Sequence, residues 1–281
     1  MRSTNRIFAP MDAYIHIPQN ELIEAIDYLW YHEAPAIKLH CYTIPFLHQE
    51  LIINFGDHFA VTGPQQQLHY DQQGMASAVL PGPITTHAQG KYKALGIMLK
   101  PFGLYRLCGL SAAALQERPL SLPDIWGASA LTLLQELDTV LTPADKLLIM
   151  EKFLLKKARP QSIPEEVMAL QTPFTLQKGH IKSNISDKLI SSKKYIHTCN
   201  TILGMAPKKY THLGLVNTAV AQIAAHPNRP LTDIAYDNGF YDQAHFIRVF
   251  KTFAGITPSA FRKAVKQQQI HDKMPNTIFL S

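Results

Sequence analysis

The sequence predicts an α+β protein, with a small N-terminal β-barrel or sandwich flanked by helices and an all-α C-terminal domain. Short alternating or apolar runs, broken by turn residues, fill residues 37–99 and predict strands. From residue 207 onward, apolar positions recur at helical spacing. The charge changes as well, because residues 1–173 hold 13 Lys and Arg against 16 Asp and Glu, whereas residues 174–269 hold 13 against 4.

The N-terminal elements follow one another along the chain. Leucine, isoleucine and tryptophan share one face of Leu22–Tyr31, which predicts a helix. Short runs that alternate or are wholly apolar then follow, separated by turn residues such as those at Pro81. The predicted strands are Ile37–Tyr42, Glu50–Phe55, Phe59–Thr62, Ser77–Leu80 and Ala94–Leu99.

Helical spacing returns after Pro101 and predicts the helices Leu104–Cys108, Leu131–Leu137 and Ala144–Leu155. The segment Ala158–Glu166 has the composition of a linker. The predicted organisation is an N-terminal domain at 1–158, a linker region at 159–173, a C-terminal domain at 174–266 with 164 as an alternative start, and a tail at 267–281.

Composition limits the class of protein. No apolar run approaches ~18 residues, so no transmembrane helix is expected. The N-terminal sequence MRSTNRIFAP lacks the apolar core of a signal peptide. Cys41, Cys108 and Cys199 have no paired spacing, which favours a reducing cytoplasm over a disulfide framework. The basic C-terminal part favours a polyanionic partner, because each neutralised phosphate releases counterions.

The stretch Leu231–Pro258 has the pattern of two short helices joined by a sharp turn and followed by a third helix. Gly239 ends the first helix, where a residue free to adopt positive φ is useful. Asp242 is the predicted N-cap of the second helix, whose apolar stripe runs from Phe246 to Phe253. Thr257 followed by proline predicts the start of the third helix.

The outer side of the second helix has side chains suited to DNA. In a helix-turn-helix unit the second helix lies in the major groove. Glutamine pairs with adenine, arginine with guanine, and lysine with guanine or phosphate. A plain helical hairpin with a charged outer face is the alternative. The candidate DNA contacts are Gln243, Ala244, His245, Ile247, Arg248 and Lys251.

A weaker copy of the unit lies 51 positions upstream. In this register Ser191 falls on Asp242 and Pro207 on Pro258, and Ile185–Leu189 is the preceding helix. The segment Pro207–Ala225 keeps helical spacing and is a rigid spacer between the copies. Two such units on one chain can read two nearby major-groove segments. The candidate DNA contacts of the first copy are Lys193, Lys194, His197 and Asn200.

The C-terminal residues Pro164–Lys266 resemble the DNA-binding domain of the AraC/XylS transcription regulators, through the ungapped stretch Pro230–Lys263 (PLTDIAYDNGFYDQAHFIRVFKTFAGITPSAFRK). The resemblance implies two helix-turn-helix subdomains joined by a long helix and sequence-specific binding to double-stranded promoter DNA. RNA polymerase is a further candidate partner. By the family pattern, Gln243, His245 and Arg248 lie at the DNA together with Lys251.

The first subdomain departs from the family pattern. His197 stands where an arginine is common, and Cys199 where a core phenylalanine is common. The family commonly has two arginines near the start of the linker helix, and in this chain those positions are His212 and Leu215. A neutral histidine contributes less than arginine to a phosphate or guanine contact. We therefore predict that the second unit carries most of the sequence reading. The first unit then mainly attracts the DNA backbone, through Lys193, Lys194, Lys208 and Lys209.

The stretches Gly90–Ser111 (GKYKALGIMLKPFGLYRLCGLS) and Glu50–Phe59 resemble the N-terminal domain of one subgroup of these regulators, an uncharacterised domain likened to cupin-type barrels. The resemblance implies a sensing or dimerising role. An unknown small-molecule effector and a second copy of the chain are the corresponding candidate partners.

Other chemistries are less favoured. A metal site needs a histidine cluster with a carboxylate, and the spacing of His40, His48, His58, His69 and His87 does not supply one. No metal or cofactor is therefore expected. Lone cysteines such as Cys41 and Cys108 are more often small buried hydrophobes than redox sensors. The sequence predicts a cytoplasmic, non-enzymatic transcription regulator. A DNA-tethered enzyme with a barrel active site and a nonspecific basic DNA binder are the alternatives.

Overall fold

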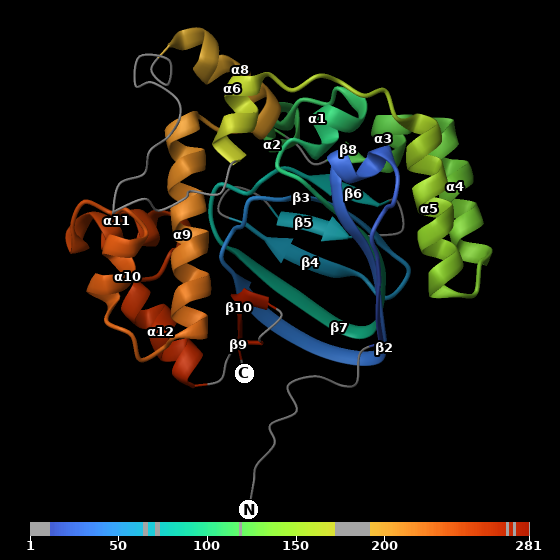
Figure 1. The fold of residues 1–281 in the computed structure, drawn as a ribbon. Helices are drawn as coiled ribbons and strands as arrows, with labels where there is room; N and C mark the ends of the chain where they lie inside the picture. The colour runs from blue at the N-terminus through green and yellow to red at the C-terminus, as the bar shows by residue number, and fades with distance from the viewer. Residues whose placement is uncertain are drawn as a thin grey trace, which may run out of the picture.

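The computed structural model describes residues 12–63, 67–70, 74–117, 120–171, 192–267, 270–271 and 274–280. An antiparallel sheet with flanking helices forms the N-terminal part, and helices form most of the C-terminal part (Figure 1). The predicted α+β class is confirmed.

All the strands of the described residues belong to one sheet, and every pairing between them is antiparallel. The strand order is β8-β6-β3-β7-β2-β10-β9, with β1 on β2 and β4 on both β7 and β5. The strands are β1 (Asp12–His16), β2 (Ile26–Thr43), β3 (Gln49–Asn54), β4 (Phe59–Thr62), β5 (Gln67–Tyr70), β6 (Met75–Ser77), β7 (Ile84–Leu99), β8 (Leu120–Ser121), β9 (Ile270–His271) and β10 (Met274–Phe279).

The long strands β2 and β7 form the centre of the sheet, paired from Ile26 opposite Leu99 to Thr43 opposite Ile84. Their register shifts between Ala34 and residue 37, and such irregularities bend a strand pair. On one side of the bend the free edge of β7 pairs with β3, and on the other side it pairs with β4. The sheet therefore curls, but its strand order ends at β8 and β9, so it is open and not a closed barrel.

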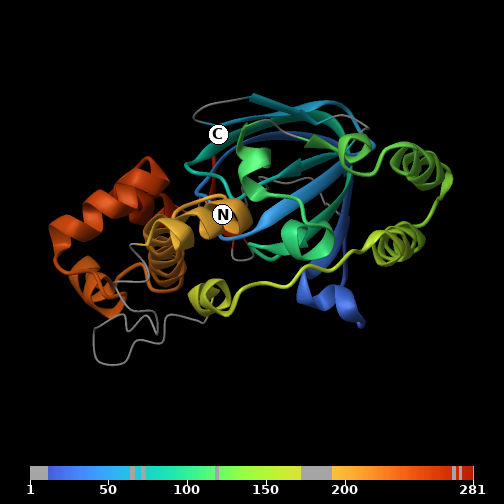
Figure 2. The same ribbon diagram turned by 90° about the horizontal axis from the view of Figure 1, so that it is seen from above.

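The outer face of the sheet packs against helices. Leu29 on β2 and Leu95 on β7 share a buried cluster with Leu133 on α4 and Met150 on α5. Figure 2 shows α4 and α5 beside the sheet, on the side away from the C-terminal helices. The N-terminal helices are η1 (Glu21–Glu24), α1 (Gly103–Cys108), α2 (Ala112–Glu117), α3 (Leu122–Trp126), α4 (Ala128–Thr139), α5 (Pro143–Lys157), α6 (Glu165–Met168) and η2 (Ala169–Gln171).

Two sequence predictions in this part are wrong. Leu22–Tyr31 is not a helix, because only the short η1 forms there and β2 begins at Ile26. Both faces of the first part of β2 are covered at Leu29–Tyr31, so its apolar residues run on without the polar alternation that marks a half-exposed strand. The strand predicted at Ser77–Leu80 ends at Ser77, because Val79 leaves the sheet to pack in the core against the C-terminal helices.

The C-terminal helices are built around α9, which contacts α8, α10, α11 and α12. The observed α9 has the predicted bounds. The preceding helix predicted at Ile185–Leu189 lies outside the described residues. The C-terminal helices are α8 (Lys193–Leu203), α9 (Pro207–Ala225), α10 (Leu231–Asp237), α11 (Gln243–Ala254) and α12 (Pro258–Lys266).

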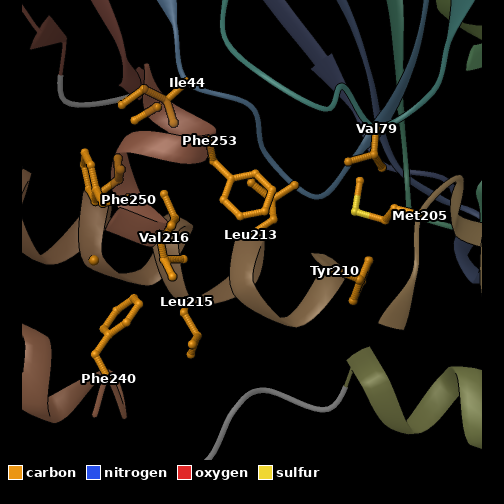
Figure 3. Close-up of a cluster of buried hydrophobic side chains, with 14 of the residues drawn as sticks. Ile44, Val79, Met205, Tyr210, Leu213, Leu215, Val216, Phe240, Phe250 and Phe253 are labelled. Carbon is orange, nitrogen blue, oxygen red and sulfur yellow. The ribbon is translucent and has the colours of Figure 1, made fainter. Parts of the chain in front are cut away.

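A shared core joins the two parts of the chain. Ile44 and Val79 from the N-terminal part belong to the same buried cluster as Leu213 on α9 and Phe253 on α11 (Figure 3). The Asn217 side chain on α9 adds two polar contacts, because its Nδ2 donates to the Pro45 carbonyl at 2.7 Å and its Oδ1 accepts from the Leu47 amide at 3.2 Å. Apolar burial and directed hydrogen bonds together fix α9 against the sheet domain.

The chain end returns to the N-terminal sheet. No local pattern in the tail predicts an element, yet β10 pairs with the end of β2, with Ile278 opposite Tyr42. Asn276 extends the pairing, because its carbonyl accepts from the Ile44 amide at 2.8 Å and its Nδ2 donates to the Ile44 carbonyl at 2.9 Å. The Tyr42 hydroxyl donates to the Ala254 carbonyl at 2.6 Å, which ties the same part of β2 to α11.

No helix among the described residues is long and apolar enough to cross a membrane.

We predict that Ile278→Ala loosens the returning strand. The Ile278 side chain is only 6% exposed, so its truncation is expected to lower the free energy of unfolding by about 2 kcal/mol. Urea unfolding followed by circular dichroism measures this change. Leu280→Ala is the matched control, because Leu280 is 36% exposed and its truncation should cost less than about 0.5 kcal/mol. Equal losses in the two variants would contradict the docking of β10.

Candidate nucleic-acid interface

The second helix-turn-helix unit consists of α10, a turn at Gly239 and α11. Gly239 has a positive φ of 72°, which lets the chain reverse after α10. Asp242 is the N-cap of α11, and its Oδ1 accepts from the His245 amide at 2.7 Å. The left-handed Gly255, with a φ of 68°, ends α11. The predicted caps at Asp242 and Thr257 are confirmed, because the Thr257 hydroxyl accepts from the Ala260 amide at 3.2 Å.

The turn is held to α9 by a buried asparagine. The Asn238 side chain donates from Nδ2 to the Ile234 carbonyl at 2.7 Å and to Gln222 Oε1 on α9 at 3.1 Å. The inner stripe of α11 is buried as predicted, and its rings pack on one another and on Phe261. These contacts leave α11 a single orientation relative to α9. The buried stripe consists of Phe246, Val249, Phe250 and Phe253.

The outer face of α11 is open to solvent. A neutral amide, a guanidinium and an ammonium group follow one another along it, with small or apolar residues between them. Ile247 is 38% exposed, although it is a large apolar side chain. This face combines base-reading side chains with an apolar contact surface. The exposed predicted residues are Gln243, Ala244, Ile247, Arg248 and Lys251.

His245 differs from the other candidates on α11. Its ring lies 5.7 Å from that of His212 on α9 and 5.7 Å from that of Phe240, both edge-on. The structure therefore packs His245 between the helices, apart from the exposed face on which the sequence analysis placed it. Burial lowers the pKa of His212, and the nearby His245, Lys208 and Arg248 lower it further.

The first unit is described from Ser192 onward. The N-cap of α8 is Ser192, whose hydroxyl accepts from the Tyr195 amide at 3.2 Å. The sequence register had aligned Ser191 with Asp242, so α8 begins one residue later than predicted. The predicted contacts Lys193, Lys194 and His197 are exposed, and Asn200 is partly exposed.

The N-terminal domain holds the far end of α8. The Ser111 hydroxyl donates to the Thr201 carbonyl at 3.1 Å. A Cβ at Gly204 would lie 2.9 Å from Gln116 Nε2 and 3.4 Å from the Cβ of Ala112, both on α2. Close packing at Gly204 thus sets the position of the first unit against the sheet domain.

A pocket of about 680 Å³ lies between the N-terminal domain and α9. Several charged groups at its wall are already paired: Arg106 binds Glu24, and His48 Nε2 lies 3.0 Å from Asp27 Oδ2. Lys100 also lines this pocket.

Metal-binding and redox chemistry find little support in the described part of the chain. No group of three or more His, Cys, Asp or Glu side chains gathers there in a form that could hold a metal ion. Burial raises the pKa of the Cys41 and Cys108 thiols, and it raises that of Cys199 to about 11. Reactive cysteines need the thiolate, so these three resemble buried structural cysteines.

Two protein families match this chain. Residues 189–264 match a family described as a helix-turn-helix domain. Residues 14–121 match a domain of unknown function (DUF6597). A comparison with curated proteins finds no match.

Solved structures of ToxT from Vibrio cholerae match this chain over most of its length. One form at 1.65 Å resolution has 10% sequence identity and a TM-score of 0.44, covering 90% of this chain and 98% of that one. A ToxT complex with (E)-4-(8-methylnaphthalen-1-yl)but-3-enoic acid has 10% identity and a TM-score of 0.43, covering 91% and 99%.

We predict that His212 makes the stability of the C-terminal domain depend on pH. Its pKa in the folded chain lies below the ordinary value near 6.5, so the unfolded chain binds more protons as the pH falls below about 6.5. The free energy of unfolding should therefore decrease between pH 7 and pH 5. His212→Gln should reduce this decrease, as measured by urea midpoints at several pH values. His226→Gln, at an exposed position after α9, should leave the decrease unchanged. An equal reduction in both variants would argue against the role of His212.

Proposed function

We propose, from the premise that this chain is a DNA-binding transcription regulator carrying an AraC-type helix-turn-helix domain, that the exposed face of α11 does most of the base reading. The observation that carries the proposal is the open outer face of α11, where Gln243, Arg248 and Lys251 lie beside one another. Glutamine and arginine each make bidentate contacts with a base edge. His245 serves a different purpose in this proposal, because its ring packs against α9 and orients α11.

We propose further that the two units read adjacent major-groove segments. The spacer α9 is continuous from Pro207 to Ala225, about 28 Å at 1.5 Å per residue. Successive major-groove segments on one face of DNA lie about 34 Å apart. Helices α8 and α11 both contact α9, which supports a fixed spacing between them.

The first unit, in this proposal, mainly attracts the DNA backbone. Lys193 and Lys194 at the start of α8 are exposed, and so are Lys208 and Lys209 in the first turn of α9. Lysine acts as a point charge toward phosphate and carries little sequence information. His197, with Asn200 beside it, supplies fewer charges than the face of α11.

The N-terminal domain is proposed to sense a small molecule or to mediate dimerisation. Its direct contacts with α8, α9 and α11 support a regulatory role, because a change in the sheet domain reaches both DNA-binding units. Regulators with this DNA-binding domain are usually not enzymes, and we assign the chain no catalytic role. RNA polymerase and a second copy of the chain remain proposed partners, and the cytoplasm the proposed compartment.

Arg248→Ala tests the dominance of the second unit. Loss of a bidentate base contact should weaken specific binding by about 1–3 kcal/mol, roughly fivefold to 150-fold. His197→Ala should have a smaller effect. Gel-shift titrations on a footprinted genomic site measure both, with Lys152→Ala on the exposed side of α5 as the control. A large loss with His197→Ala and almost none with Arg248→Ala would overturn the assignment.

Lys193→Ala tests backbone attraction by the first unit. Loss of one phosphate contact should lower the slope of log affinity against log salt by about 1 and weaken specific and nonspecific sites alike. Fluorescence anisotropy across a salt series measures this slope. A loss confined to the specific site would instead show that Lys193 reads a base.

A further inference from the structure

The inner face of the sheet gathers aromatic side chains around one carboxylate. Tyr28 on β2 and Glu50 on β3 both lie opposite Met98 on β7. Trp30 lies opposite Gly96, the next inward position of β7. Directly opposite residues of an antiparallel pair project from the same face, so Tyr28, Trp30 and Glu50 share the inner face.

Gly96 lets the Trp30 ring lie across β7. A Cβ at position 96 would stand 2.0 Å from Cε2 and 2.4 Å from Nε1 of Trp30, so only glycine leaves room for the indole. The indole N–H lies near enough to the Glu50 carboxylate to oppose, by hydrogen bonding, the rise in its pKa. The Trp30 ring therefore lies over Gly96 of β7, on the side of Glu50.

Three more rings complete the surroundings of the carboxylate. Phe59 on β4 stacks on Tyr70 of β5, with centroids 4.8 Å apart and planes inclined by 5°. Phe59 also lies 5.8 Å from Tyr92 on β7. The Glu50 charge helps to raise the pKa of both phenols, so both lie within electrostatic range of it. We call this group the aromatic box: Tyr28, Trp30, Phe59, Tyr70 and Tyr92 with Glu50.

Glu50 is the acidic group of the box, and its burial among rings makes its negative charge costly. Desolvation raises the pKa of Glu50 to about 7, and the residue as a whole is half-buried. No described lysine, arginine or histidine forms an ion pair with it. A carboxylate removed from water is costly without a positive partner, and a cation bound beside Glu50 would lower that cost.

We propose that the aromatic box binds a small organic cation, whose ammonium group lies among the ring faces and against the Glu50 carboxylate. Ring faces attract cations most strongly where water is excluded, and quaternary ammonium groups are recognised in this way. A metal ion such as Ca²⁺ fits less well, because it takes six or more oxygen ligands and the box offers one carboxylate. An anionic ligand would be repelled by Glu50. The inference rests on the proposed regulator function, in which the cation is the effector.

Calorimetry with the full-length protein tests the ligand class. The probes are tetramethylammonium, choline and the tert-butyl analogue of choline, in which carbon replaces the charged nitrogen. Choline is expected to bind at least tenfold more tightly than its uncharged analogue. Binding should also change the fluorescence of Trp30, which Trp126→Phe isolates from the second tryptophan.

Glu50→Gln keeps the shape of the side chain and removes its charge. We expect at least a tenfold loss of choline affinity, whereas Glu136→Gln on the exposed side of α4 should bind as the unmodified protein does. Circular dichroism verifies that each variant folds. If Glu50→Gln does not fold, Tyr92→Leu replaces it, because loss of one ring face should still weaken choline severalfold.

The pH dependence provides an independent measurement. As the pH rises toward 7, choline affinity should increase about tenfold per pH unit, because the cation prefers the ionised form of Glu50. Above pH 7 the affinity should level off, because Glu50 is then ionised. The facing groups stay neutral in this range: the pKa values of Tyr28, Tyr70 and Tyr92 are raised, and burial lowers that of His32. Burial also raises the pKa of Cys41 beside Tyr92, and Asp27 beside Tyr28 is paired with His48.

Three results would overturn the proposal: equal binding of choline and its uncharged analogue, unchanged affinity in Glu50→Gln, or no binding of either cation at millimolar concentration. Gel shifts on the same protein separate this outcome from the proposed function. Specific DNA binding without cation binding rejects the box alone. Cation binding without specific DNA binding rejects the regulator proposal and leaves the box in place.

Discussion

The pairing of β2 with β7 is the interaction on which the rest of the structure depends. Strands β3 and β4 join the free edge of β7, and β1 and β10 join β2, so every other strand is attached to this pair directly or through a neighbour. The bend near Ala34 turns the strands attached through β3 and those attached through β4 toward each other over the inner face of the sheet. The outer face is left for α4 and α5.

One continuous strand connects the inner face of the sheet with the DNA-binding helices. β2 begins near Tyr28 and Trp30 of the aromatic box and ends at Thr43, where β10 pairs with it. Tyr42, near this end, donates its hydroxyl hydrogen to the last residue of α11. The box and α11 are therefore connected through the residues of a single strand.

The second helix-turn-helix unit could be predicted because its signals are local. Asp242, Gly255 and Thr257 each end or start a helix through a cap within a few residues, and the buried stripe of α11 implies its exposed face. The packing of His245 was not predictable in this way, because its ring contacts His212 on another helix. The start of α8 was misplaced by one residue, because two adjacent serines could each supply the cap.

The sequence by itself determined the fold class, the helix-turn-helix repeat and the face of α11 that carries Gln243 and Arg248. Only the tertiary structure decided that Leu22–Tyr31 enters a strand, that the chain end pairs with β2, and that Glu50 lies among rings from four other strands. Helix signals depend on neighbours within one or two turns. Strand partners and the lining of a sheet's inner face depend on residues far apart in the chain, whose pairing no local pattern specifies.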